Sequence, residues 1–361
     1  MCKRIFKEQT STDGDIPFYK IGTFGAEPDA FISRELFEEY RGKFQYPNIG
    51  DMLISASGTI GRTVEYKGEE AYFQDSNIVW FKHDDRVDNS FLKCIYEIVK
   101  WSGIEGSTIK RLYNDNFLKT EFSMPKVAEQ QQIGMYFQSL DHLITLHQRK
   151  CEETKKLKKY MLQKMFPQNG QTVPEIRFSG FTDAWEQRKL GEIATETYGG
   201  GTPKTSNEEF WKGDIPWIQS SDLIDECLFD VRPRKCISQE AVSKSATKLV
   251  PQNSIAIVTR VGVGKLAFMP FSYATSQDFL SLSGLKIDPE FTVYALYKMM
   301  QSVSNEVQGT SIKGVTKDEL LAKKIIFPSC NEQKKIGAYL HNLDHLITLH
   351  HRKYTSTLKS P

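Results

Sequence analysis

Several features that mark common classes of protein are missing from this sequence of 361 residues. It has no adjacent prolines, which excludes the Asn/Asp-Pro-Pro-aromatic tetrad that a methyltransferase needs. Its six cysteines include no CxxC pair, so we expect structural thiols rather than disulfides or zinc ligands. No apolar run is long enough to span a bilayer and the first residues form no signal peptide, so we expect a cytoplasmic protein.

Motifs for catalysis and metal binding are also missing. The stretch Gly262–Lys265 resembles part of a phosphate-binding P-loop, but the motif needs Gly where Thr259 stands and Ser or Thr where Leu266 stands. His341 and His345 have a helical spacing that suits zinc, but the other half of the chain does not repeat the pair. We therefore predict no catalytic residue and no metal ligand.

The chain has little excess of either charge, since 47 Lys and Arg residues and 45 Asp and Glu residues leave a net charge of +2. This balance permits nucleic-acid binding by local basic patches but does not demand it. The hydrophobic content of 39% and charged content of 25% are those of a globular protein. The length is enough for two ordinary domains and their connections.

The dominant feature of the chain is an internal repeat. Residues 140–147 (LDHLITLH) occur again, unchanged, at residues 343–350, an offset of 203. The same offset relates Glu129-Gln130 to Glu332-Gln333 and, further upstream, Gly61 to Gly264. Outside such positions the globular stretches differ greatly, whereas the segments around the octapeptide hardly differ. We infer one scaffold that is built twice and carries two different recognition surfaces.

Each near-identical segment is predicted to be a long helix. The apolar positions follow a 4-3 heptad spacing, continuing in the first copy through Cys151, Thr154, Leu157, Met161 and Met165. A helix of about 38 residues would be near 57 Å long, more than one small domain needs. The expected interface residues are Ile133, Phe137, Leu140, Ile144 and His147 in the first copy and Ile336, Leu340, Leu343, Ile347 and His350 in the second.

The simplest packing is an antiparallel coiled coil of the two copies about a pseudo-two-fold axis. The alternative is two separate amphipathic helices, each packed on its own domain. We interpret the lysine-rich run 155–159 as a solvated face of the coiled coil with Leu157 on the seam, in preference to a DNA clamp.

The globular stretches combine strands, glycine-containing turns and one short helix each, which indicates an α+β fold. Strands are expected at 52–56, 63–66 and 77–81, and a helix at 91–100. In the second half a strand is expected at 254–259, and Asp288 is expected to cap a helix that starts with Pro289.

Each half carries a glycine-rich turn that ends in a cation and a Ser/Thr loop with a basic exit. Backbone N–H groups, hydroxyls and cations bind phosphate oxygens, while Arg and Gln can read guanine and adenine edges. The alternative is an ordinary surface turn with a solvated cation. The candidate DNA-binding residues are Gly58, Thr59, Arg62, Thr108, Lys110, Arg111, Thr202, Lys204, Gln219, Arg260, Lys265, Ser311 and Lys313.

Four motifs give the sequence a family resemblance. They are residues 180–191 (GFTDAWEQRKLG), 199–203 (GGGTP), 213–218 (GDIPWI) and 129–133 (EQQQI). Together with the duplicated layout they resemble the specificity (S) subunits of Type I restriction-modification systems. The resemblance covers nearly the whole chain.

The resemblance implies a non-catalytic DNA reader in which two target recognition domains each read one half of a bipartite site. It also implies that the helices fix the spacing and dock two modification (methyltransferase) subunits, which restriction (translocase-nuclease) subunits then join. S-adenosylmethionine, ATP and Mg²⁺ would belong to those partners. The runner-up is a coiled-coil interaction scaffold whose domains bind protein or sugar.

The expected organisation has five parts: a first recognition domain at 1–126, a first helix at 127–167, a linker at 168–179, a second recognition domain at 180–328 and a shortened second helix at 329–361. The motif at 180–191 has no counterpart before Gly14, so we expect the first domain to lack this opener. Either the chain is trimmed there or it naturally starts and stops there.

Overall fold

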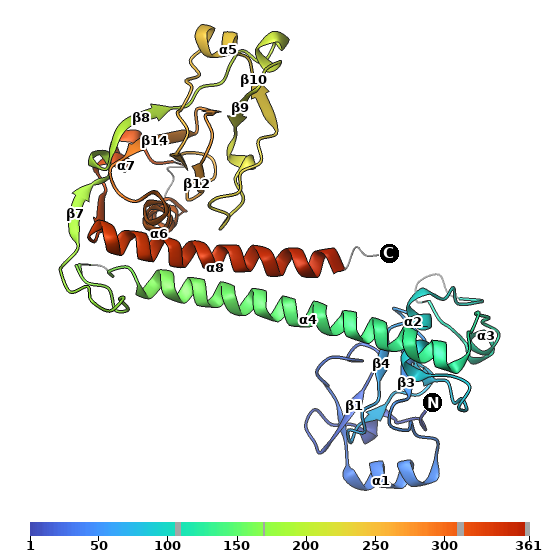
Figure 1. Cartoon of the computed structure of the whole chain (residues 1–361). Helices are drawn as coiled ribbons and strands as arrows, with labels where there is room; N and C mark the ends of the chain where they lie inside the picture. The colour runs from blue at the N-terminus through green and yellow to red at the C-terminus, as the bar shows by residue number, and fades with distance from the viewer. Residues whose placement is uncertain (105–109, 169, 309–313, 358–361) are drawn as a thin grey trace. The chain divides into compact units, whose positions relative to one another are not determined.

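A computed structural model describes residues 1–104, 110–168, 170–308 and 314–357. The chain divides into two compact units, Met1–Thr145 and Leu146–Pro361, and each is described by itself below. The ribbon is drawn in Figure 1. Among the described residues no helix is long and apolar enough to cross a membrane.

The first unit contains two small sheets, with strand orders β2-β1-β5 and β4-β3-β6. Strand β3 separates two clusters of buried side chains, because successive residues of a strand face opposite sides. Leu53 joins Phe18, Phe37 and Tyr72 on one side, while Ile54 packs with the helix α2 on the other. The elements are η1 (Lys7–Gln9), β1 (Ile16–Tyr19), β2 (Phe31–Ile32), α1 (Arg34–Lys43), β3 (Met52–Ser55), β4 (Thr63–Glu65), β5 (Tyr72–Phe73), β6 (Ile78–Trp80), α2 (Asn89–Ile98), α3 (Asn114–Leu118) and the start of α4 (Val127–Lys164).

The second unit contains sheets with strand orders β12-β11-β14-β8, β10-β9-β13 and β15-β7. Strand β11 again divides two clusters: Ile255 and Ile257 face the helix α6, and Ala256 and Val258 face the opposite side. The elements are β7 (Glu186–Lys189), η2 (Leu190–Glu192), β8 (Ala194–Gly199), η3 (Glu208–Trp211), β9 (Ile215–Ile218), η4 (Ser220–Asp222), β10 (Lys235–Ile237), α5 (Gln239–Lys244), β11 (Ser254–Val258), β12 (Leu266–Met269), β13 (Ala274–Thr275), β14 (Phe279–Leu285), α6 (Pro289–Gln308), α7 (Lys317–Ala322), β15 (Lys324–Phe327) and α8 (Cys330–Thr357).

A buried glutamine at the start of each long helix makes the same hydrogen bonds in both units. Gln130 accepts from the Asp88 backbone N–H at 2.9 Å and donates to the Pro125 carbonyl at 2.8 Å. Gln333 accepts from the Asp288 N–H at 2.8 Å and donates to the Pro328 carbonyl at 2.7 Å. We call this pair of equivalent residues the glutamine clamp. It ties the first turn of α4 to α2 and the first turn of α8 to α6.

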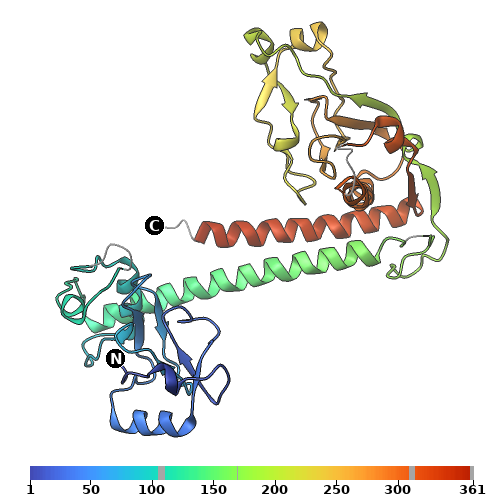
Figure 2. The same ribbon diagram turned by 180° about the vertical axis from the view of Figure 1, so that it is seen from behind.

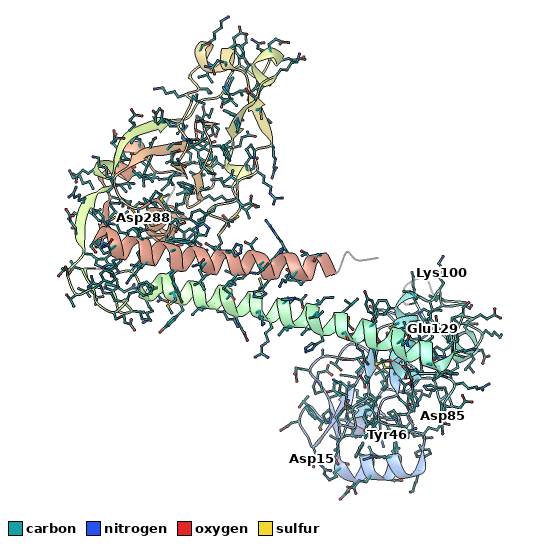
Figure 3. All side chains as sticks on the ribbon, in the orientation of Figure 1. Asp15, Tyr46, Asp85, Lys100, Glu129 and Asp288 are labelled. Carbon is teal, nitrogen blue, oxygen red and sulfur yellow. The ribbon has the colours of Figure 1, made fainter. Side chains whose placement is uncertain are left out.

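A glycine one turn later lets each long helix approach its partner closely. A Cβ atom on Gly134 would lie 3.0 Å from the Phe91 backbone nitrogen, and one on Gly337 would lie 2.7 Å from the Phe291 nitrogen. Both distances are at or below the closest that real Cβ atoms reach. The repeated Glu-Gln and Ile-Gly pairs of the sequence therefore mark the junction between globular part and helix. Figure 3 labels Glu129 at the start of α4 and Asp288 at the start of α6.

The structure confirms the long first helix, since α4 spans 38 residues, and it confirms the antiparallel pairing in the second unit. His147 and His350 face each other with their Nδ1 atoms 3.1 Å apart. Further along, the Cys151 thiol donates to the Ile347 carbonyl at 3.8 Å. Figures 1 and 2 show the part of α4 after Leu146 side by side with α8.

The predicted position of Leu157 on the seam is wrong. Leu157 is 40% exposed, while Lys158 is only 6% exposed. The heptad step after Thr154 is four residues, to Lys158, rather than three. The ammonium of Lys158 lies 2.5 Å from Asp344 and 5.6 Å from the centre of the Tyr294 ring, which compensates its burial. The lysine run is therefore solvated except at this one residue.

The other predicted interface residues differ in their burial. Ile336, Leu340 and Leu343 are buried in the core of the second unit. Phe137, which we expected on the seam, is 48% exposed. Half-buried positions are Ile133, Leu140, Ile144, His147, Ile347 and His350.

Candidate nucleic-acid interface

The turn between β3 and β4 is held open by the buried side chain of Ser55. Its hydroxyl accepts from the Arg62 backbone N–H at 2.9 Å and donates to the Thr59 carbonyl. Gly58 and Gly61 have φ angles of 67° and 94°, which L residues with a Cβ atom rarely adopt. The result is a hydrogen-bonded turn on which Gly58, Thr59 and Arg62 are exposed.

Two further cations lie beside this turn. The Gly58 N–H donates to the Lys110 carbonyl at 3.0 Å, and Ser57 forms an isolated β-bridge with Arg111. Lys110 and Arg111 are exposed, and the Arg62 guanidinium makes only a long contact of 3.4 Å with the Gly25 carbonyl. The backbone contacts thus bring cations that are about 50 residues apart in the sequence to one turn of the first unit. This arrangement suits the phosphate backbone of a nucleic acid.

The second unit repeats the backbone hydrogen bond and the glycine conformation of this turn. The Val315 N–H donates to the Thr259 carbonyl at 2.8 Å, just as the Leu112 N–H donates to the Ala56 carbonyl at 2.8 Å. Gly264 has a φ angle of 109° where Gly61 has 94°. Arg260 is exposed at the start of the turn. Thr108, Ser311 and Lys313 lie outside the described residues.

Lys265, the counterpart of Arg62, is placed differently from the sequence interpretation. Its ammonium donates to the Leu223 carbonyl at 3.1 Å and lies 3.7 Å from Asp225, and its side chain is 27% exposed. These contacts fix the turn to the segment after η4. Its role as a phosphate contact stays a prediction.

The remaining candidates of the second unit lie at two places, Gln219 beside this turn and Thr202 and Lys204 beside Trp217. A Cβ atom on Gly262 would be 3.8 Å from the Ser220 Cβ. The turn therefore lies against η4, which begins at the residue after Gln219. Gln219 itself is half-buried. Thr202 and Lys204 are exposed and follow Gly201, whose carbonyl accepts from the Trp217 indole at 3.0 Å.

The sequence interpretation missed a group of cations on the second unit, Arg232, Arg234 and Lys235. Arg234 donates to the Ser221 carbonyl at 3.1 Å and lies 3.4 Å from Asp222, yet 69% of its side chain is exposed. Lys235 lies 5.5 Å from the Trp211 ring centre. Their close spacing in the sequence, Arg-Pro-Arg-Lys, was the available signal.

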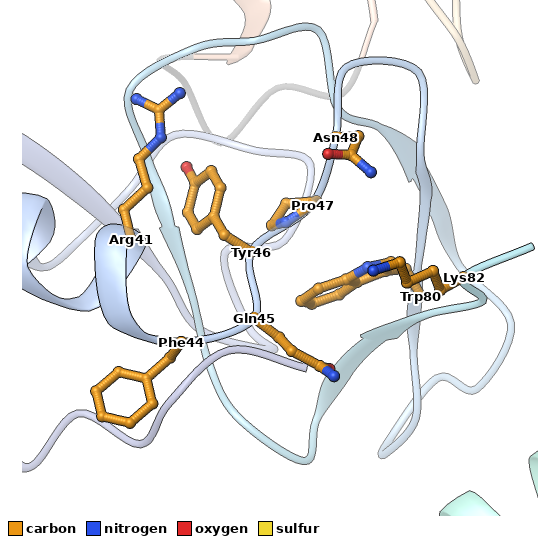
Figure 4. A pocket seen from close by; sticks show the side chains of 8 residues that line it. All are labelled: Arg41, Phe44, Gln45, Tyr46, Pro47, Asn48, Trp80 and Lys82. Atoms are coloured by element: carbon orange, nitrogen blue, oxygen red, sulfur yellow. The ribbon is translucent and has the colours of Figure 1, made fainter.

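A polar hollow of about 370 Å³ opens on the first unit (Figure 4). Arg41 and Lys82 line it together with Trp80 and Tyr46. The Arg41 guanidinium lies 5.3 Å from the Tyr46 ring centre, and the Tyr46 hydroxyl donates to the Ala71 carbonyl. Burial, and then hydrogen bonding with Tyr66, raises the pKa of Tyr46 above its ordinary value, so the hydroxyl stays protonated. Cations beside aromatic rings are a second feature that suits nucleic acid.

Metal binding has no support in the geometry of the described residues, where no three His, Cys, Asp or Glu side chains gather to hold an ion. His341, which the sequence spacing singled out, instead packs 4.4 Å from the Phe229 ring centre and lies 3.2 Å from Glu290. The phenyl rings of Phe229 and Phe268 and the carboxylate of Glu290 share a hollow of about 570 Å³ with it.

The two units share one α+β arrangement, each with an exposed polar turn and each joined to a long helix, so the chain is a duplicated protein. The Type I restriction modification DNA specificity domain matches residues 1–156 and again residues 182–359. The chain belongs to this family.

Curated relatives match part of the chain closely. A putative type I restriction enzyme specificity subunit of Haemophilus influenzae is 58% identical over 149 residues, 40% of this chain and 39% of that protein. The EcoR124I/EcoR124II specificity subunit of Escherichia coli is 34% identical over 172 residues, 45% of this chain and 41% of that protein. These matches span about two fifths of each relative's length.

Solved structures match nearly the whole fold. The S subunit of a type I restriction-modification system from M. genitalium has a TM-score of 0.60 at 15% identity and covers 99% of this chain and 89% of its own. The HsdS subunit of Thermoanaerobacter tengcongensis has a TM-score of 0.51 at 17% identity and covers 95% of this chain and 86% of its own. These likenesses confirm the predicted fold class.

Proposed function

We propose that the protein is the non-catalytic DNA-specificity subunit of a Type I restriction-modification complex and reads a bipartite site. The observation that carries this proposal is the matched turn in each unit: one backbone frame, held by equivalent hydrogen bonds, presents different exposed side chains. The first unit offers Arg62, Lys110 and Arg111, and the second offers Arg260 and Arg234. A duplicated frame with divergent contacts suits a target with two unlike halves.

The proposed division of labour follows from the side-chain chemistry. Exposed lysines hold phosphate oxygens as point charges and set the register of each unit on the duplex. Arg260 and Gln219, next to the turn of the second unit, have the donors and acceptors that distinguish guanine and adenine. Phosphate contacts supply affinity and base contacts supply sequence choice.

The proposed partners are two modification (methyltransferase) subunits, docked on the helices, and restriction (translocase-nuclease) subunits that complete the endonuclease. S-adenosylmethionine, ATP and Mg²⁺ are assigned to those partners. Equivalent first turns of α4 and α8, each tied down by the glutamine clamp, support two equivalent docking sites. The unbroken α4, which runs from the first unit into the second, supports a spacer role between two half-sites.

Exchange of one domain tests the proposal. The chain is combined with its modification partner, and residues 180–327 are replaced by the equivalent domain of a relative. Methylation-aware sequencing of the host genome is expected to show a change in one half of the methylated motif and none in the other. A change in both halves, or in neither, would contradict the division into two readers.

A gel shift on a random bipartite library separates this function from that of a protein- or sugar-binding scaffold. DNA binding that falls steeply with salt supports the specificity subunit, since released counterions drive phosphate contacts. Absence of binding both with and without the methyltransferase partner would favour the scaffold.

A further inference from the structure

A buried aspartate ends the short helix η4 of the second unit. Only 1% of the Asp222 side chain is exposed. One of its carboxylate oxygens accepts a hydrogen bond from the Gln219 backbone N–H at 2.9 Å. The other oxygen lies 3.4 Å from the Nε atom of Arg234. A buried carboxylate needs such a cation, because an unpaired buried charge is strongly destabilising.

The protein holds Arg234 along one edge of its planar guanidinium. Nε lies beside Asp222, and Nη2 donates a hydrogen bond to the Ser221 carbonyl at 3.1 Å. Among the described residues, the edge formed by Nη1 and Nη2 has no further hydrogen-bond or ion-pair partner. The Arg234 side chain is 69% exposed although its carboxylate partner is buried. The guanidinium is therefore fixed on its protein side and open to a ligand on the other.

A free guanidinium edge matches a ligand that presents two acceptors side by side. The O6 and N7 atoms of guanine are such a pair in the major groove of DNA, and arginine binds both at once. Phosphate oxygens are acceptors too, but the Asp222 carboxylate offsets the positive charge of Arg234 and so weakens the attraction to an anion. The uncharged edge of a base requires only the donors. The Asp222–Arg234 pair therefore favours guanine over phosphate.

The other arginines near η4 have no buried support of this kind. Arg232 pairs with Asp230, but the two side chains are 79% and 54% exposed. Arg260 is exposed and has no ion pair among the described residues. A side chain that is already held in place loses less conformational freedom on binding. Arg234 is thus better prepared than its neighbours to select a base.

We propose that Arg234 binds a guanine in the half-site read by the second unit, and that Asp222 is the positioning residue that fixes its guanidinium. This inference rests on the proposed function and adds the base that one side chain selects. Asp222 also holds the backbone of Gln219, the residue before η4. One buried carboxylate therefore positions two candidate base contacts at the same turn.

Selection from a random bipartite DNA library tests the proposal, with the full chain bound to its methyltransferase partner. The unaltered complex is expected to select a guanine at one position of one half-site. Arg234→Lys keeps a cation for Asp222 but loses the planar edge, so it should reduce that preference at least about fivefold and leave the other positions unchanged. Asp222→Asn should weaken the same preference. Arg232→Lys is the matched control and should change no base preference.

A uniform loss of affinity for all sequences in Arg234→Lys would make this residue a phosphate contact and overturn the proposal. So would an effect on stability alone, which thermal unfolding measures. If Arg234→Lys does not fold, the double variant Asp222→Asn/Arg234→Gln, which leaves no unpaired buried charge, must lose the guanine preference instead.

The failure of this inference differs from the failure of the proposed function. If the unaltered complex selects no bipartite motif, the proposed function is wrong and the role of Arg234 falls with it. If the complex selects a bipartite motif that Arg234→Lys leaves unchanged, only the assignment of Arg234 and Asp222 is wrong.

Discussion

Replacing Lys158 with methionine removes one charge from the contact between α4 and α8 while keeping most of the side-chain volume. The ammonium of Lys158 is 2.5 Å from Asp344 and the lysine side chain is 8% exposed. Asp344 also accepts a hydrogen bond from the Tyr294 hydroxyl at 2.6 Å. Burial and then the Asp344 carboxylate raise the pKa of Tyr294 above its ordinary value, so that hydroxyl remains a donor.

The expected loss of stability depends on how well the Asp344 carboxylate is compensated once its lysine is gone. Removal of one partner of a buried ion pair costs about 3–5 kcal/mol. Asp344 keeps the hydrogen bond from Tyr294 and 20% of its side chain is exposed, which softens the penalty. We therefore expect Lys158→Met to lower the free energy of unfolding of the second unit by about 2–3 kcal/mol.

Urea denaturation followed by tryptophan fluorescence measures this loss, since Trp185 packs 5.9 Å from Phe166, just beyond the end of α4. Lys159→Met is the matched control, because Lys159 is exposed, and should cost less than about 0.5 kcal/mol. Adding Asp344→Leu to Lys158→Met should recover part of the loss, because the unpaired charge is gone. If Lys158→Met is as mild as Lys159→Met, the buried ion pair does not stabilise this helix contact.

Three further predictions concern binding, pH and spacing. Lys110→Ala and Arg111→Ala should each weaken all DNA sequences about equally and reduce the salt slope by about one unit, as measured by titration at several salt concentrations. Burial, then His147 and two nearby lysines, lower the pKa of His350; the unfolded chain therefore binds the proton more readily. The contribution of the His147–His350 pair to the free energy of unfolding should be fully present above about pH 6.5. It should fall as the pH drops toward the folded-state pKa of His350, as urea unfolding at a series of pH values measures. Four residues inserted after Thr154 should advance α4 by about 6 Å and 40° and change the spacing of the methylated half-sites, as read by sequencing.

Each of these has an outcome that contradicts it. Unchanged affinity and salt slope would make Lys110 and Arg111 ordinary solvated residues. His350→Gln should flatten the pH dependence between about pH 5 and 7, and an unaltered curve would place the titration elsewhere. Methylation at the original spacing after the insertion would show that α4 does not set the distance.

Periodicity along the chain was enough to predict the long helix and its antiparallel partner. The 4-3 spacing also leads to position 158, but the apolar Leu157 was chosen over a lysine there. Lys158 is buried on the seam because Asp344 and Tyr294, which are far away in the sequence, compensate its charge. The glycine turn at 58–61 was predictable because positive φ angles leave a residue signature. The hydrogen bond from the Lys265 ammonium to the Leu223 carbonyl was not predictable, because a backbone carbonyl 42 residues away leaves no signature in the sequence. The DNA contacts themselves stay predictions.

The glutamine clamp has a consequence for how such a protein changes its target. Gln130 and Gln333 grip backbone atoms, not side chains, at the Asp-capped start of α2 and α6. These two hydrogen bonds therefore do not depend on which side chains the domain presents at its loops. We expect that another domain with an Asp-capped helix at this position can form the same hydrogen bonds, whatever the residues of its loops. A change of target sequence would then require the exchange of one globular domain and no change in the long helices.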